Sequence, residues 1–300
     1  MTSQAVVGVD GSEGGLDAIA LARRLVSDAN LTLVNAYGIL AIPPGYVTYS
    51  DAAAQLERAA VEMLQHTAAE RARGAQTLAM PFSAAGFALH VAAEQQHADL
   101  IVIGSAHRGP VGRVLVGDDC RATIHGAPCP VAVAPHDYAE DIAPIERVLV
   151  GFNGRPESRA AVEQAAAIAH RLSARLRVIT VVEPPGRVLA NYAYALDWPE
   201  LVSKIRDSAQ HALDELLREL ENAEGEVVVG IAADEIERAT DHADVVVLGS
   251  RGWGPVRRVL LGSTSDRLVH RSPCPVIVVP RPVDAPVAPP ALTDAERAVH

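Results

Sequence analysis

Short apolar segments alternate with longer amphipathic segments along the chain. In the first half, runs rich in Val, Ile, Leu and Ala predict strands at residues 5–9, 31–36, 100–103 and 131–134, with a weaker strand at 76–82. The segments between them carry apolar residues at near-helical spacing and predict helices at residues 12–26, 49–73, 90–97 and 119–125. This half therefore alternates between strands and helices from one end to the other.

The second half repeats the same order. Strands are predicted at residues 147–151, 175–182, 226–230, 245–248 and 276–279, and helices at 157–172, 200–221, 234–242 and 265–270. Strands that alternate with helices indicate right-handed crossovers and a parallel sheet covered by helices on both faces. The sequence predicts an α/β protein with two tandem doubly wound, Rossmann-like, parallel five-stranded sheets.

An internal repeat supports this division. Residues 104–135 recur as residues 249–280 with a constant offset of 145 and no gap. Because roughly 100–200 residues make one domain, a repeat at this spacing indicates a duplicated domain. We predict domains at residues 1–140 and 141–282, followed by a Pro-rich, disordered tail at 283–300.

Composition narrows the class of protein. The chain has 300 residues and a formal net charge of −11, which argues against binding to nucleic acid or to an anionic membrane surface. No apolar run reaches the roughly 18 residues that cross a bilayer. Residues 1–10 lack the features of a signal peptide, so we expect a cytoplasmic protein. Cys120, Cys129 and Cys274 form no CxxC pair and are expected in the core, with a redox or metal role as the alternative.

Two loops of each half should meet at the ligand crevice, which in such sheets lies outside the carboxyl ends of the strands. One follows the first strand and carries Asp10 in the first half or Asn153 in the second. The other is the Gly-rich loop after the fourth strand, which in the second half runs from Gly249 to Gly262 and Ser263. Glycines allow close approach of a ligand, and a helix N-terminus attracts an anion, which predicts a phosphate site. The alternative is that the glycines only form a turn and Ser263 caps the helix.

Local charge favours the phosphate site in the second half. The segment 250–271 carries five arginines and one aspartate, namely Arg251, Arg257, Arg258, Arg267, Arg271 and Asp266. The corresponding segment of the first half has three arginines and two aspartates. A cationic segment inside a strongly acidic protein is suited to an anionic ligand.

The motifs of several other ligand and enzyme classes are missing. Lys204 is the only lysine and lies far from the glycine loops, which excludes a Walker A motif. No GxGxxG follows the first strand, no GxSxG is present, and the histidines lack a spacing typical of metal ligands. We predict no catalytic residue and no metal site of the protein's own.

The combined pattern resembles the universal stress protein family in its tandem form. The likeness rests on VGVDGS at residues 7–12, on Gly-x2-Gly-x9-Gly-Ser beginning at Gly249, and on PCPV at 273–276, and it covers residues 4–281. The resemblance implies that ATP-binding members hold the phosphates on the glycine loop and helix start. It also implies an acidic residue near the ribose and metal, here replaced by Asn153, and an adenine contact at the end of the second strand, here Val181. The residues expected to bind ATP, with or without Mg²⁺, are Gly151, Phe152, Asn153, Val181, Gly249, Arg251, Gly252, Gly254, Arg258, Gly262, Ser263, Thr264 and Ser265.

The first half departs from the family pattern. His107 replaces the second glycine, and Asp118 and Asp119 occupy the positions of Ser263 and Thr264. A carboxylate at a helix N-terminus takes the place of an anion and repels a phosphate by roughly 4 kcal/mol at 4 Å and an effective dielectric near 20. We therefore predict a degenerate site formed by Asp10, Ala36, Gly104, His107, Gly109, Gly117 and Asp118.

Two classes of function stay open at this point. The first is a nucleotide-dependent stress-response or regulatory protein with an adenine nucleotide and an unidentified protein as partners, and with at most slow ATP hydrolysis. The second is a tandem scaffold that binds no nucleotide. A third class, which has less support, is an enzyme that acts on another adenylated or phosphorylated small molecule. The sequence shows no candidate nucleophile for such an enzyme.

The last strand of each half, 131–134 and 276–279, is apolar and lies at a predicted sheet edge. Unpaired edges favour unwanted association. We expect these two strands to pair with each other and form an intrachain pseudo-dimer, as the family resemblance also implies. The alternative is that each is buried beneath its flanking helices, and a further homodimer is left open.

Overall fold

The computed structural model describes residues 4–38, 49–105, 118–140, 143–183, 198–250, 259 and 261–281. The predicted tail at 283–300 lies outside these residues. The first half contains β1 (Ala5–Gly8), α1 (Glu13–Leu25), η1 (Asp28–Asn30), β2 (Leu31–Ala36), α2 (Tyr49–Arg71), β3 (Gln76–Met80), α3 (Ala85–Gln95), β4 (Leu100–Gly104), α4 (Asp118–Ile124) and β5 (Val131–Ala134). The predicted strands and helices of this half are present in the predicted order.

The second half follows with the same alternation. It contains η2 (Tyr138–Glu140), β6 (Arg147–Gly151), α5 (Pro156–Leu172), β7 (Arg175–Val182), α7 (Trp198–Arg218), β8 (Ala223–Val229), α8 (Ala232–Ala239), η3 (Thr240–His242), β9 (Val245–Gly249), α9 (Ser263–Arg271) and β10 (Val276–Val279). Strand β8 begins three residues before the predicted strand at 226–230. The predicted alternating α/β architecture is confirmed.

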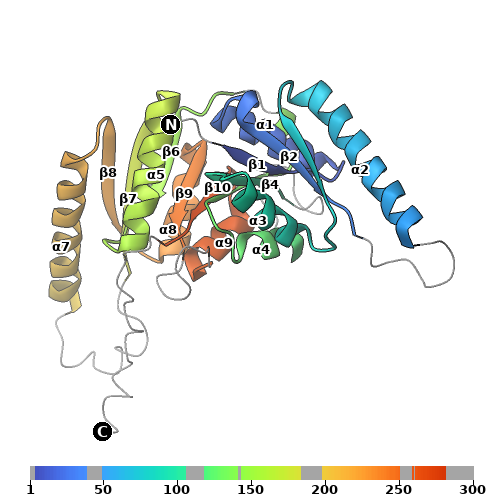
Figure 1. The fold of residues 1–300 in the computed structure, drawn as a ribbon. Coiled ribbons are helices and arrows are strands. Elements are labelled where there is room, and N and C mark those ends of the chain that lie inside the picture. The colour runs from blue at the N-terminus through green and yellow to red at the C-terminus, as the bar shows by residue number, and fades with distance from the viewer. Residues whose placement is uncertain are drawn as a thin grey trace, which may run out of the picture.

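The ten strands of the described residues form one continuous sheet in the order β3-β2-β1-β4-β5-β10-β9-β6-β7-β8 (Figure 1). Neighbouring strands are parallel within each half, and the halves join where β5 and β10 pair antiparallel. At this join Val133 faces Val276, Ala132 faces Ile277 and Val131 faces Val278. The expected edge pairing is therefore confirmed, and the two five-stranded units share a single sheet.

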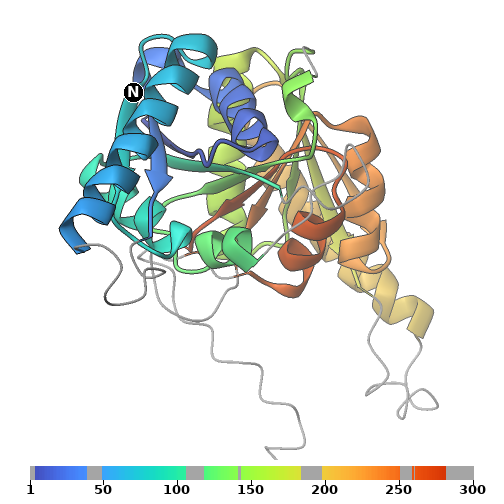
Figure 2. The same cartoon turned by 90° about the vertical axis from the view of Figure 1, so that its right-hand side faces the viewer.

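Helices cover both faces of the sheet, as Figure 1 and Figure 2 show. Buried residues of α1, α2, α5 and α7 share one hydrophobic cluster, and those of α3, α4, α8 and α9 share the other. Successive strand residues point to opposite faces, so Val7 joins the first cluster and Val6 the second. Burial on both faces explains why the strands appear in the sequence as continuous apolar runs.

Helix α3 differs from its prediction, because it begins at Ala85 and the sequence predicted a start at residue 90. The segment before residue 90 contains Ser83 and Gly86, which favour a loop. In the structure Gly86 lies against α4, where an added Cβ would be 2.9 Å from the backbone nitrogen of Thr123. Tertiary packing of α3 on α4 therefore requires a glycine inside a helix, against its local propensity.

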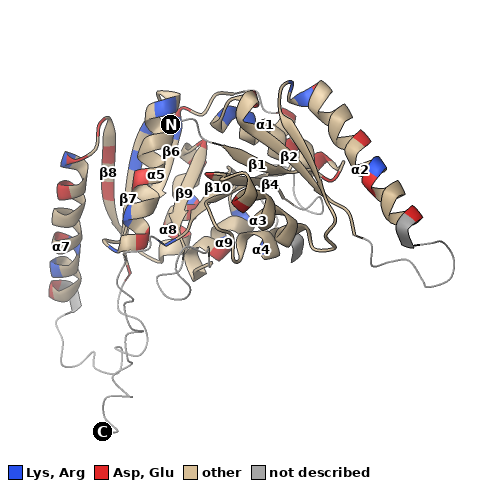
Figure 3. Ribbon diagram, in the orientation of Figure 1, with Lys and Arg blue, Asp and Glu red and all other residues tan. Residues whose placement is uncertain are grey.

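Charged residues are spread along the helices, most visibly along α2, α5 and α7 (Figure 3). Strand β8, at one edge of the sheet, carries Glu224 and Glu226, and charge on an edge strand opposes pairing with another molecule. Among the described helices, none has the length and apolar character that crossing a bilayer requires.

The three cysteines are free thiols in the core, as expected. Burial raises the pKa of Cys129 and of Cys274 to about 12. Because the thiolate is the reactive form, these two side chains are poor nucleophiles near neutral pH.

The carboxylate of Asp244 fixes the start of the first strand of the second half. It accepts hydrogen bonds from the backbone N–H groups of Glu146 and Arg147 at 2.9 and 2.8 Å, and from Nη2 of Arg147 at 2.6 Å. Burial raises the pKa of Asp244, but these bonds and the Arg147 charge outweigh it and hold the pKa below 3.8. In the first half, Asp99 accepts from the N–H of Gln4 at 3.0 Å.

We expect Asp244→Asn to lower the free energy of unfolding by about 1–3 kcal/mol at neutral pH, because it weakens hydrogen bonds to a charged acceptor. The folded-state pKa lies below the unfolded-state value, so this stabilisation is present above about pH 4 and is lost as the pH falls through the folded pKa. Urea denaturation of both proteins at neutral and acidic pH measures the difference. Asp99→Asn is the matched control and should lower the free energy of unfolding by less. If Asp244→Asn lowered the free energy of unfolding equally at both pH values, the stabilising role assigned to the Asp244 carboxylate would be contradicted.

Candidate functional site

A cavity of about 430 Å³ lies at the carboxyl ends of the strands of the second half. The ends of β6, β7 and β9 and the first turns of α5, α8 and α9 surround it. Its lining residues are Gly151, Phe152, Asn153, Arg155, Glu157, Ser158, Ile179, Val181, Ala232, Ile236, Leu248, Gly249, Ser250, Gly262, Ser263, Thr264 and Ser265. This is the crevice in which doubly wound sheets bind ligands.

Nine of the residues predicted to bind nucleotide line this one cavity. They are Gly151, Phe152, Asn153, Val181, Gly249, Gly262, Ser263, Thr264 and Ser265. The other four, Arg251, Gly252, Gly254 and Arg258, lie outside the described residues. The fold thus brings together residues from four separate segments of the sequence.

The start of α9 forms one end of the cavity. Gly262 is the N-cap, and its N–H donates to the Ser265 hydroxyl at 2.9 Å, so the alternative that Ser263 caps the helix is wrong. Within the described part of the chain, no group accepts a hydrogen bond from the N–H of Ser263 or Thr264. Free amides and the helix dipole make this end of the cavity suitable for an anion.

The loop after β6 holds Asn153 in a fixed turn. Its side-chain oxygen accepts from the N–H of Arg155 at 3.1 Å, and its own N–H donates to the Ser158 hydroxyl at 3.3 Å. Asp10 forms the equivalent turn in the first half, accepting from the N–H of Ser12 at 3.0 Å. Because the Asn153 oxygen is engaged in the turn, its amide NH₂ group is the donor that it offers to a ligand.

Gly249 allows β9 to end directly against the first turn of α5. A Cβ at Gly249 would lie 2.5 Å from the backbone oxygen of Glu157, and one at Gly104 would lie 2.0 Å from that of Gly14. Both halves therefore use a glycine to pack the fourth strand on the helix that follows the first strand. This contact brings the two loops of the crevice together.

The sequence did not identify several residues of the cavity. Glu157 is 7% exposed, and among the described residues its carboxylate has no hydrogen-bond or ion-pair partner. Ser250 is 5% exposed, and its hydroxyl oxygen is buried without a partner. Ile179, Ile236 and Leu248 add an apolar wall. The sequence could have indicated Glu157 as a cavity residue by its position. It lies at the start of the helix after the first strand, and that end of the helix also faces the crevice.

The first half retains part of the corresponding framework. Asp10, Ala36 and Gly104 lie at the carboxyl ends of β1, β2 and β4. Asp118 is the first residue of α4, as Ser263 is of α9, which agrees with the repeat offset of 145. His107, Gly109, Gly117 and the side chain of Asp118 lie outside the described part of the structure.

Comparison with known proteins identifies the same fold in both halves. Residues 1–135 and 144–280 each match the model of the Universal stress protein family. A universal stress protein of Mycobacterium tuberculosis is 30% identical over 200 residues, which cover 62% of this chain and 66% of the relative. The matched part thus spans just under two thirds of the relative's length. A second from the same organism is 32% identical over 194 residues, which cover 60% and 61% of the two chains.

Solved structures give the same result for the fold across the whole chain. A universal stress protein from Archaeoglobus fulgidus superposes with a TM-score of 0.66 at 21% identity, covering 95% of this chain and 98% of the other. A protein from Pseudomonas aeruginosa, described as a putative universal stress protein, gives a TM-score of 0.64 at 17% identity over 93% and 94% of the two chains.

We expect Gly249→Ala to destabilise the protein by about 1–3 kcal/mol, because the added methyl group would overlap the backbone of α5. Gly151→Ala is the control at the end of the neighbouring strand. Its Cβ would meet only the side-chain atoms of Leu248 at 3.2 Å and Ile236 at 3.4 Å, which can adjust. Chemical denaturation should show that Gly249→Ala is considerably less stable than Gly151→Ala. Equal stability of the two variants would disprove the close contact between β9 and the first turn of α5.

Proposed function

We propose that this chain, which belongs to the universal stress protein family, is an ATP-binding stress-response or regulatory protein with its nucleotide site in the C-terminal half. The observation that carries the proposal is the cavity described above. One end offers the free amides of α9, and the other has an apolar wall, so a single cavity suits both a phosphate chain and a flat base.

The proposed placement of the ligand follows from these two ends. The phosphates lie at the N–H groups of Ser263 and Thr264, where the helix N-terminus stabilises negative charge. The adenine lies against Val181 and Ile236, and the ribose lies near the amide of Asn153. Ser250 lines the same cavity, and its buried hydroxyl, which has no partner among the described residues, would supply a further polar group.

Because of Glu157, we expect the nucleotide to bind together with Mg²⁺. Glu157 lines the same cavity as the anion-binding end of α9, and two like charges at 4 Å repel by roughly 4 kcal/mol at an effective dielectric near 20. A divalent cation between the carboxylate and the phosphate oxygens converts this repulsion into attraction. Magnesium prefers such oxygen ligands and is usually held by one or two carboxylates together with substrate phosphates.

The N-terminal half is proposed to bind ATP weakly, because Asp118 begins α4 where Ser263 begins α9. No general base has been assigned at the C-terminal cavity, so the proposed role is nucleotide binding with at most slow hydrolysis. In this proposal the nucleotide-bound and nucleotide-free forms differ in stability and in their affinity for a protein partner in the cytoplasm.

ATP with Mg²⁺ should stabilise the purified protein against urea by about 2.7 kcal/mol at one hundred times the dissociation constant. Gly262→Asp should abolish this gain, because the new carboxylate fills the anion site. The variant should still fold, since Gly262 has φ −82° and Asp is a favoured N-cap residue. Asp118→Ser is the matched control and should leave the stabilisation unchanged. If the stabilisation by ATP were lost in Asp118→Ser but kept in Gly262→Asp, the nucleotide site would lie in the first half. If ATP did not stabilise the wild type, the scaffold function would be favoured.

Glu157→Gln should make ATP binding less dependent on Mg²⁺. Without the carboxylate, affinity for metal-free ATP should rise at least about tenfold, because a repulsion of several kcal/mol is removed. Calorimetric titration with and without Mg²⁺ measures the ratio, and Glu163→Gln on the exposed side of α5 is the control. An unchanged ratio in Glu157→Gln would show that this carboxylate does not face the phosphates.

A further inference from the structure

We propose that Glu13, His136 and Asp137 form a site for a divalent transition-metal ion in the N-terminal half, with Zn²⁺ as the best-suited ion. One ligand atom from each of these residues lies within 4.8 Å of the other two. The proposed site is separate from the nucleotide cavity and does not depend on the function proposed above.

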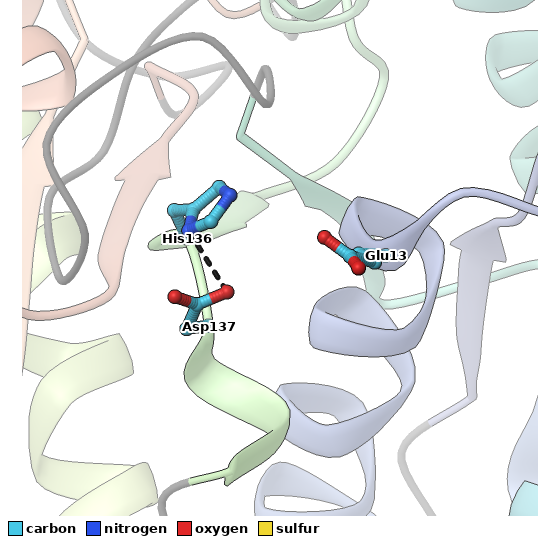
Figure 4. Close-up of side chains that lie close together, drawn as sticks. All are labelled: Glu13, His136 and Asp137. Carbon is cyan, nitrogen blue, oxygen red and sulfur yellow. Dashed lines mark ion pairs between the residues drawn. The ribbon is translucent and has the colours of Figure 1, made fainter.

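Two distant segments of the chain bring the three side chains together. Glu13 begins α1, whereas His136 and Asp137 follow β5 and precede η2. Nδ1 of His136 lies 2.9 Å from Oδ1 of Asp137. Figure 4 shows the carboxylate of Glu13 directed from the start of α1 toward this pair. The three groups thus converge on one space from two sides.

Asp17 fixes the backbone of the segment that carries His136 and Asp137. Its carboxylate, on a residue only 2% exposed, accepts hydrogen bonds from the N–H of Asp137 at 3.1 Å and of Ala139 at 2.7 Å. Asp137 is in the left-handed region with φ +62°, a conformation that these bonds to Asp17 support. Because the segment is already fixed by the protein, binding a metal requires little additional ordering of the backbone.

The local charge favours a cation. Glu13, Asp17 and Asp137 contribute three carboxylates around the single imidazole of His136, and Asp137 and His136 both act electrostatically on Asp17. A divalent cation at the centre relieves the mutual repulsion of the carboxylates.

The donor set indicates the class of metal. One imidazole nitrogen and two carboxylate oxygens suit Zn²⁺ and related transition metals, whereas Mg²⁺ and Ca²⁺ prefer oxygen alone. Zinc ligands at about 2.1 Å in a tetrahedral arrangement lie about 3.4 Å apart, so the exposed Glu13 side chain needs only a small movement. A water molecule would complete the coordination.

The second half provides an internal comparison. Pro156 begins α5 where Glu13 begins α1, and Arg281 occupies the repeat position of His136. Neither residue ligates a cation, so the proposed site occurs in one half alone. A metal bound there would link the start of α1 to the segment that leaves the first half.

Calorimetric titration of the full-length protein with Zn²⁺, in the absence of nucleotide, should give one site per chain. Glu13→Gln and His136→Ala should each weaken binding at least tenfold, and Mg²⁺ at the same concentrations should produce no heat from this site. Glu13→Gln preserves the shape of an exposed side chain, so its effect is separate from folding, which circular dichroism checks.

His66→Ala is the matched control, because it removes the exposed His66–Glu70 pair at 3.4 Å on α2 and should leave Zn²⁺ affinity unchanged. Equal Zn²⁺ affinity in the wild type, Glu13→Gln and His136→Ala would overturn the proposal. So would a loss in His66→Ala as large as that in Glu13→Gln, since binding would then be a property of surface histidine–carboxylate pairs.

Discussion

The antiparallel contact between β5 and β10 determines the architecture of the molecule. The residues of both strands are buried, and the pairing removes one exposed edge from each five-stranded unit. The strands of the two halves run in opposite directions across this join, so their carboxyl ends, and with them the two crevices, lie at opposite borders of the common sheet. Each crevice is therefore free to change its ligand chemistry without direct contact with the other.

Within each half, the contact between the fourth strand and the first helix positions the crevice. Gly104 and Gly249 allow backbone contact with Gly14 and Glu157, and no larger side chain fits there. This contact is common to both copies, although their surrounding residues differ. The backbone thus forms the same crevice in both halves, and the side chains around the crevice differ between them.

Sequence reasoning identified the elements whose signal is local. The strands are short apolar runs between glycines and polar turns, and the Gly-rich loops lead into helices, so the sheet followed from the pattern of the sequence. The nine cavity residues followed from this pattern together with the family resemblance, which alone indicated Val181. The start of α3 was missed because Gly86 is required by α4, which the local sequence does not reveal. The Glu13, His136 and Asp137 cluster was missed for a similar reason. Its members lie at opposite ends of the first half, and no spacing rule connects them.

Several sequence differences between the copies change the charge at corresponding positions. The first half carries Asp10, Glu13, Asp118 and Asp137 where the sequence of the second half has Asn153, Pro156, Ser263 and Pro282. These four changes each remove a carboxylate, whereas the change from Gly14 to Glu157 adds one. Since a helix N-terminus attracts anions, carboxylates placed near it favour a cation, as we propose for Glu13 and Asp137 in the first half. Uncharged residues leave the field of the helix available to an external anion, as we propose for the second half, where Glu157 would be compensated by Mg²⁺. In these two proposals, one duplicated backbone carries two sites of opposite charge preference.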